Sequence, residues 1–162
     1  MDYDLYKNSI DLLKERGVSL KDIAKLVIFS QKKYYPELKE NEAIDAIHSV
    51  LKKREVQNVI MTGIELDKLA EKRLLTSPFQ EIMDKDNPLY GVDEVIILSI
   101  LNLYGSIAFT NYGYLDKVKP YILEDLNEIK EGVCNVYLDD IVAAIAAAAC
   151  SKYAHNHHGN KI

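Results

Sequence analysis

The chain carries no charged residue from Val95 to Leu115, and this stretch restricts the folds open to it more than any other feature. On length alone the stretch could form a membrane-spanning helix. However, it contains several hydroxyl, amide and glycine residues, and its glycine-rich end at 112–114 predicts a loop. A helix that is apolar on all sides is also typical of the centre of a soluble helical bundle. We therefore predict a buried, central helix over residues 90–108.

The rest of the sequence also predicts helices, because apolar residues recur at helical spacing and no sustained period-two strand pattern is present. At 162 residues, the chain is long enough to bury a substantial core. We expect an all-α fold in a single domain over residues 1–162, a helical bundle whose central apolar helix is surrounded by the others. Besides 90–108, the predicted helices cover 4–16, 20–35, 40–53, 55–74, 78–84, 120–130 and 138–154.

Three local features refine this prediction. Ser19 and Asp22 form a capping sequence before the second helix, with Asp in place of the usual Glu or Gln. Gly63 marks either a close packing point or a break in its helix. The run Ala143–Ala149 permits close contact between helices, so the last helix is predicted to be deeply packed.

Composition excludes some classes of function. The net charge is -5, whereas a nucleic-acid-binding surface needs clustered basic residues, so we expect no nucleic-acid partner. The first residues show no basic-then-apolar leader, and the two cysteines, Cys134 and Cys150, form no CxxC pair. We therefore expect a cytoplasmic protein with reduced thiols, either free or peripheral to the membrane.

Two acidic pairs, Asp93-Glu94 and Asp139-Asp140, stand directly before the most apolar helical stretches. Each pair by itself can be explained as acidic residues that stabilise the positive end of a helix dipole. Neighbours on a helix point about 100° apart, so one member of each pair can face a shared cavity while the other faces solvent. Buried carboxylates need a hydrogen-bonded, ionic or metal partner, and this requirement suggests a site.

Asp116 and Lys119 lie between the two pairs. Three residues apart, they can form a solvated ion pair on a helical turn, or they can lie in an extended loop, because Pro120 disfavours helix at Lys119. Together with the pairs, they supply carboxylates from three successive segments and one lysine. Such a set favours a hard divalent cation next to a phosphate. We predict that carboxylates from all three segments converge on one cavity.

Three segments resemble a known family: Gly91–Glu94, Tyr114–Pro120 and Val136–Ala144. They contain a DE pair, an LDxxKP segment and a DDxxAG-like segment, in the family's order and at similar spacing. The C-terminal half therefore resembles phosphatidylglycerophosphatase A. The amphipathic N-terminal half looks like the soluble branch, whose members are sometimes labelled low-temperature-requirement proteins. The Gly/Ser/Pro-rich N-terminal motif of well-studied members has only a weak echo here, at Thr62-Gly63.

The resemblance implies a Mg2+-dependent phosphatase that converts phosphatidylglycerophosphate to phosphatidylglycerol. Its partner would be a phosphate-ester substrate, such as a lipid headgroup at the membrane surface, and no transmembrane span is expected. Monomer and homo-oligomer both remain open. By matched position, the catalytic residues would be Asp93, Asp116, Lys119 and Asp140, and the metal ligands would be Asp93, Glu94, Asp139 and Asp140.

Two other functions stay open. All-α nucleotide pyrophosphohydrolases also place helical carboxylates around Mg2+, by an ExxE pair followed by ExxD. Glu37 with Glu40 and Glu81 with Asp84 supply these letters, but the gap between them is long. The other alternative is a non-catalytic helical regulatory or assembly module that keeps the acidic residues for stability.

Overall fold

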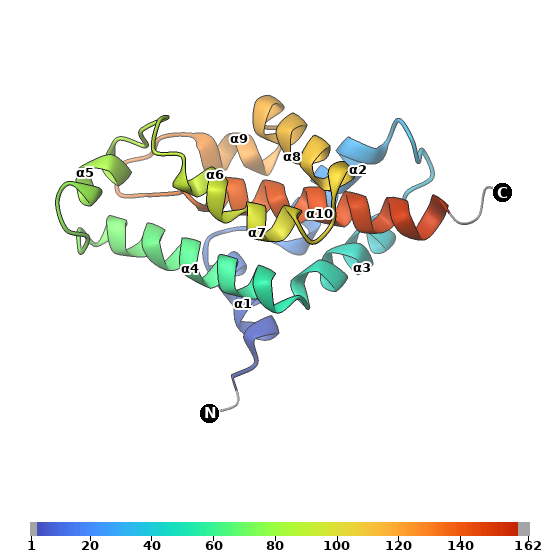
Figure 1. Ribbon diagram of the computed structural model, residues 1–162, viewed down its shortest axis with the longest axis horizontal. Helices are drawn as coiled ribbons and strands as arrows, with labels where there is room; N and C mark the ends of the chain where they lie inside the picture. The colour runs from blue at the N-terminus through green and yellow to red at the C-terminus, as the bar shows by residue number, and fades with distance from the viewer. Residues whose placement is uncertain (1–2, 159–162) are drawn as a thin grey trace.

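The computed structural model describes residues 3–158, and within them the chain forms helices and no strands (Figure 1). The predicted all-α class is therefore confirmed. The helices are α1 (Leu5–Glu15), α2 (Leu20–Gln31), α3 (Glu40–Leu51), α4 (Arg54–Glu71), α5 (Phe79–Asp84), α6 (Val92–Ile96), α7 (Leu98–Leu101), α8 (Ser106–Val118), α9 (Ile122–Asn127) and α10 (Leu138–His158).

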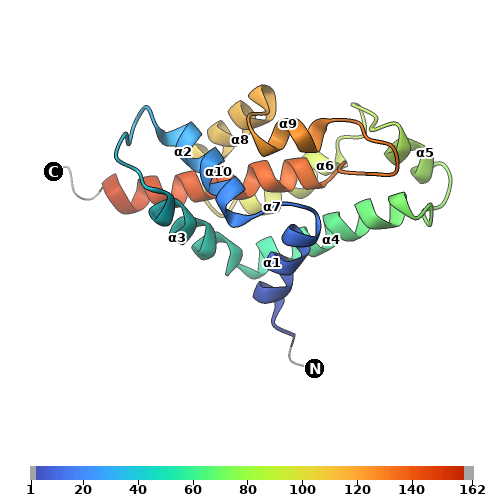
Figure 2. The same cartoon turned by 180° about the vertical axis from the view of Figure 1, so that it is seen from behind.

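The central helix is α10, which runs along the long axis of the molecule. In Figure 2, seen from behind, α2 crosses in front of α10, whereas α7 packs on its other side. Every residue from Val136 to Ser151 is buried, including the whole alanine run. The predicted deep packing of the last helix is confirmed, because side chains this small let the surrounding helices approach α10 from all directions.

The prediction of a central helix over 90–108 is wrong. This segment divides into α6, α7 and the start of α8, and several of its apolar side chains face outward, with Val95 60% exposed. Gly105, directly before α8, has a φ of +78°, a conformation that favours glycine. No helix in the described part of the chain is long and apolar enough to cross a membrane.

The predicted loop at 112–114 is also wrong, because these residues lie inside α8. Gly113 is on the exposed side of that helix, where it costs only about 1 kcal/mol relative to alanine. The helix predicted over 120–130 is shorter than expected and corresponds to α9, Ile122–Asn127.

The other local predictions agree with the structure. Ser19 and Asp22 form a complete capping box at the start of α2. Gly63 is a close packing point between α4 and α10, where a Cβ atom would lie 2.4 Å from Cδ1 of Ile141 and 3.0 Å from Cβ of Tyr137.

Candidate functional site

The first turn of α10 carries Asp139 and Asp140, both of which are buried. Burial raises the pKa of Asp139 to about 6, and burial together with the charge of Asp139 raises that of Asp140 to about 8. Two adjacent buried carboxylates are costly when ionised, so they need nearby positive charge.

Lys119 supplies part of that charge. It lies at the C-terminal end of α8 with φ of 49° and ψ of 52°, a left-handed conformation that ends the helix immediately before Pro120. Its Nζ donates to Oδ1 of Asp116 at 2.7 Å and to Oδ2 of Asp139 at 2.8 Å. Burial alone would lower the pKa of Lys119, but the two carboxylates raise it above its ordinary value, so the side chain is a permanent cation.

Tyr112 holds the second acid of α10. Its hydroxyl donates to Oδ1 of Asp140 at 2.9 Å, and burial together with the negative charge of Asp140 raises the pKa of the phenol. Tyr112 precedes Asp116 by four residues, so both lie on one side of α8. The sequence prediction missed Tyr112, because placing 112–114 in a loop concealed this helical spacing.

Asp93 and Glu94 lie in the first turn of α6. The charge of Asp93 raises the pKa of Asp140, and the charge of Glu94 raises that of Tyr112, so both acids lie near the start of α10. Asp86, from the turn before α6, is a further member that sequence reasoning missed. Burial and the charge of Asp93 raise its pKa, and it also interacts with Lys119 and Asp139.

The structure thus brings the three predicted segments near one end of α10. Lys119 and Tyr112 join the second segment to the third, whereas Asp93 and Glu94 act on them through their charge. Within residues 3–158, no three acidic, histidine or cysteine side chains are arranged to hold a metal ion jointly. The tight three-carboxylate convergence that we predicted is therefore not present in this arrangement.

The residues nevertheless fit Mg2+. This ion prefers oxygen ligands and is usually held by one or two carboxylates, with water and substrate phosphate completing its shell. Asp139 and Asp140 offer only carboxylate oxygens, and Lys119 is the cation in direct contact with this pair. An additional cation would relieve the remaining excess of buried negative charge.

A third buried acid, Asp67 of α4, fixes the start of α10. Its carboxylate accepts from the backbone N–H of Tyr137 at 3.1 Å and from that of Leu138 at 3.0 Å. These two amides are therefore not available to bind a phosphate. A signal for Asp67 existed in the sequence, since it lies on the apolar face of α4 with Ile60 and Ile64.

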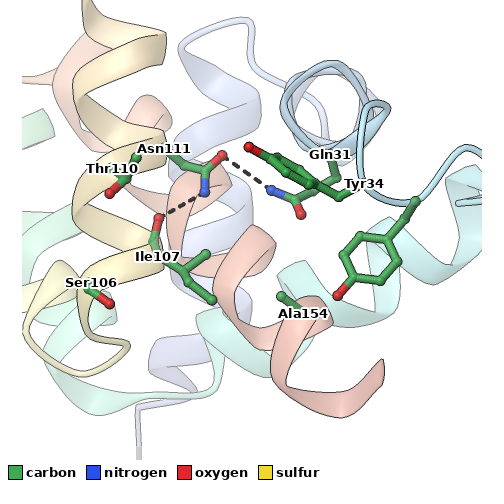
Figure 3. Close-up of a pocket in the computed structure, with 8 residues that line it drawn as sticks. Gln31, Tyr34, Ser106, Ile107, Thr110, Asn111 and Ala154 are labelled. Carbon is green, nitrogen blue, oxygen red and sulfur yellow. Dashed lines mark hydrogen bonds between the residues drawn. The ribbon is translucent and has the colours of Figure 1, made fainter. Parts of the chain in front are cut away.

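A separate cavity of about 330 Å3 lies between the end of α2, the first half of α8 and the C-terminal part of α10 (Figure 3). Across it, Nε2 of Gln31 donates to Oδ1 of Asn111 at 3.2 Å. No charged side chain lines it, so it lacks the cation that a phosphate would need. Its lining is Gln31, Tyr34, Tyr35, Ser106, Ile107, Thr110, Asn111 and Ala154.

The phosphatidylglycerophosphatase A family model matches residues 12–155, which is most of the chain. The chain belongs to the phosphatidylglycerophosphatase A family. The match extends well into the N-terminal half, where the sequence motifs were missing. The predicted family is therefore confirmed over residues 12–155 and not only for the C-terminal part of the chain.

Several proteins resemble this phosphatidylglycerophosphatase A family member over most of its length. The chain is 58% identical over 143 residues to YutG of Bacillus subtilis (strain 168), covering 88% of this chain and 86% of that protein. The low temperature requirement C protein of Listeria monocytogenes has the same fold, with a TM-score of 0.94 and 52% identity over 98% of this chain and 99% of that one. A Bacillus stearothermophilus protein matches with a TM-score of 0.93 and 54% identity, covering 97% and 98%.

Proposed function

We propose that this protein is a Mg2+-dependent phosphatase that hydrolyses the phosphomonoester of phosphatidylglycerophosphate. The observation that carries the proposal is the ion pair of Lys119 with Asp116 and Asp139, directly beside the buried Asp140. These residues come from two of the three segments that resemble the family motifs, and the third segment, with Asp93, lies close by.

Asp139 and Asp140, assisted by Asp93 and Glu94, would hold the cation. When bound, Mg2+ supplies polarisation of the phosphoryl group and lowers the pKa of a bound water. Asp140 can ligate only after losing its proton, and the Tyr112 hydroxyl can remain on Oδ1 while Oδ2 binds the ion.

Lys119 would bind the substrate phosphate. An ammonium group has three hydrogen-bond donors, and Asp116 and Asp139 accept two of them. The third donor can bind a phosphoryl oxygen and stabilise charge as it develops there. Asp116 acts by holding the ammonium group in place, at a point where Lys119 is still partly open to solvent.

The pyrophosphohydrolase alternative has less support. The side chains of Glu37, Glu40, Glu81 and Asp84 are exposed, and Asp84 is occupied by Arg73 and Gln80. The non-catalytic alternative is separated from the phosphatase by experiment, because it requires neither Mg2+ binding nor phosphate release.

The test is phosphate release from phosphatidylglycerophosphate in detergent micelles and from water-soluble glycerol 3-phosphate, with Mg2+ and with EDTA. We expect release only with Mg2+. Asp140→Asn and Asp93→Asn preserve side-chain shape and should lower turnover by about 100-fold or more. Lys119→Ala should lower turnover while leaving Mg2+ affinity unchanged or slightly higher, because it removes a like charge.

The matched control is Asp11→Asn, which changes an exposed acid on α1 and should leave turnover unchanged. Mg2+-dependent turnover that survives both Asp140→Asn and Asp93→Asn would place the chemistry elsewhere. The absence of both turnover and any effect of Mg2+ would favour the non-catalytic module.

A further inference from the structure

The exposed side of α8 carries almost no charge. Its outward residues follow the helical spacing of one continuous face, which we call the α8 outer face: Ser106, Phe109, Thr110, Gly113, Tyr114, Lys117 and Val118. Phe109 is 40% exposed and Tyr114 is 49% exposed. A helix face that meets water normally carries charged side chains, whereas this one has only Lys117, close to its end.

Aromatic rings border this face next to the candidate site. Phe29 of α2 stacks on Tyr114 with ring centroids 5.8 Å apart, and its other contact is edge-on with Tyr121 at 5.7 Å. Both tyrosines are exposed, although each is large enough to belong in a core. Tyrosine is enriched where a protein passes from lipid to water, because its ring is apolar and its hydroxyl is polar.

The segment before α8 has the same character. Between Val95 and Gly105 the exposed residues include Leu98 and Leu103, and none of them is charged. The stretch that sequence analysis placed in the core is therefore largely a surface. Within the described residues, no part of the chain covers these side chains.

The position of the site identifies what would cover the α8 outer face. Lys119, whose side chain is partly exposed, follows the end of this face by one residue, and Lys117 lies within it. A second copy of the chain seated on this face would close the approach to Lys119. A lipid bilayer would instead present phosphates at that approach, with the lysines at the level of the headgroups and Phe109 directed toward the acyl region.

We propose that the α8 outer face docks on a lipid bilayer and thereby delivers a lipid phosphate to Lys119. The biological meaning of this contact rests on the proposed phosphatase function, but the contact itself needs no catalysis. Docking on a bilayer would explain why α8, which ends at the candidate site, has no charged side chain on either its buried or its exposed side before Asp116.

The test is flotation of the full chain with vesicles of phosphatidylcholine and phosphatidylglycerol that contain no substrate, in EDTA. We expect the wild type to float and Phe109→Glu to reduce the bound fraction about tenfold, because it places a charge where apolar contact is needed. Leu74→Glu is the matched control: Leu74, which is 64% exposed, follows the end of α4 and lies outside the α8 outer face, so its replacement should leave flotation unchanged.

A second measurement separates docking from chemistry. Phe109→Glu should slow hydrolysis of lipid substrate in vesicles but not of glycerol 3-phosphate. A wild type that does not float, or equal losses in Phe109→Glu and Leu74→Glu, would overturn the docking surface. So would light scattering that shows a dimer which Phe109→Glu dissociates. Flotation without any phosphatase activity would keep the docking surface and remove the proposed function, and activity on glycerol 3-phosphate without flotation would do the reverse.

Discussion

At the scale of single residues, three carboxylic acids are buried within residues 3–158: Asp67, Asp139 and Asp140. All three lie around the start of α10, although Asp67 comes from a different helix. Their burial raises the pKa of each one. They differ in their partners: Asp67 accepts from two backbone amides and the Cys134 thiol, whereas Asp139 accepts from Lys119 and Asp140 from Tyr112.

Asp67 should make the protein less stable as the pH rises. Burial raises its folded-state pKa to about 7, above the ordinary value of 3.8. The folded state therefore holds the proton more tightly, so the free energy of unfolding falls between about pH 4 and pH 7, by up to roughly 4 kcal/mol. Asp67→Asn removes this titration, so urea denaturation should show a flatter pH dependence than in the wild type. Equal slopes in both proteins would contradict the buried ionisation.

Mg2+ affinity should rise with pH for a related reason. Asp139 and Asp140 have pKa values of about 6 and about 8 and must be deprotonated to ligate. Between about pH 6 and pH 8, Asp140 releases one proton for each ion bound, so affinity should increase up to about tenfold per pH unit over this interval. Calorimetric titration checks this, and Asp140→Asn should flatten the curve. Affinity that does not change over this interval would indicate other ligands.

At the scale of helices, α4 determines the position of the first turn of α10, which carries Asp139 and Asp140. Its Gly63 allows α10 to approach closely, and one turn later its Asp67 caps the first amides of α10. Arg16, at the end of α1, adds a bond to Glu71 of α4 and another to the backbone carbonyl of Cys134, before α10. The position of Asp139 and Asp140 therefore depends on residues from two other helices.

Replacing Gly63 by alanine should destabilise the packing of α4 on α10. The added Cβ would lie 2.4 Å from Cδ1 of Ile141, and such overpacking typically costs about 1–3 kcal/mol. Ile141→Val removes that Cδ1 atom and should recover part of the loss in the double variant. Gly113→Ala is the control, because nothing lies within 4 Å of its added Cβ and alanine favours helix. Urea denaturation measures the free energy of unfolding of the wild type, of Gly63→Ala, of its double variant with Ile141→Val and of Gly113→Ala. A Gly63→Ala protein as stable as the wild type would refute the close contact.

At the scale of the whole molecule, the candidate site joins the start of the central helix to α6, α8 and the turn at Asp86. A cation bound there would connect these elements in the folded state only. Ligand binding to the folded state alone raises stability by about 2.7 kcal/mol at a concentration 100 times the dissociation constant.

Mg2+ should therefore raise the melting temperature of the wild type by several degrees, since about 1 kcal/mol corresponds to roughly 2–4 °C for a chain of this size. EDTA should reverse the shift, and Asp140→Asn should not show it. The control Asp11→Asn should behave like the wild type. An equal shift in Asp140→Asn would mean that Mg2+ stabilises the fold from another place.

The sequence by itself determined the helical class, the deep burial of the alanine-rich last helix, the capping box at Ser19 and the family. These follow from local spacing, from side-chain size and from ordered motifs, and each is readable without knowing what packs against what. The sequence also indicated Asp116, Lys119, Asp139 and Asp140, of which Lys119 contacts Asp116 and Asp139 directly.

Only the tertiary structure decided which apolar segment is central. The charge-free stretch after Glu94 and the alanine-rich helix both lack a polar face, and sequence gives no rule for choosing between them. α10 lies inside because its small side chains let neighbouring helices approach from all sides. The larger residues of 95–115 are instead divided among α6, α7 and α8, and many of their side chains are exposed. The site also depends on which helices meet at the start of α10, because this packing brings Asp67, Tyr112 and Asp86 to it. The spacing of residues within one segment cannot predict such long-range packing.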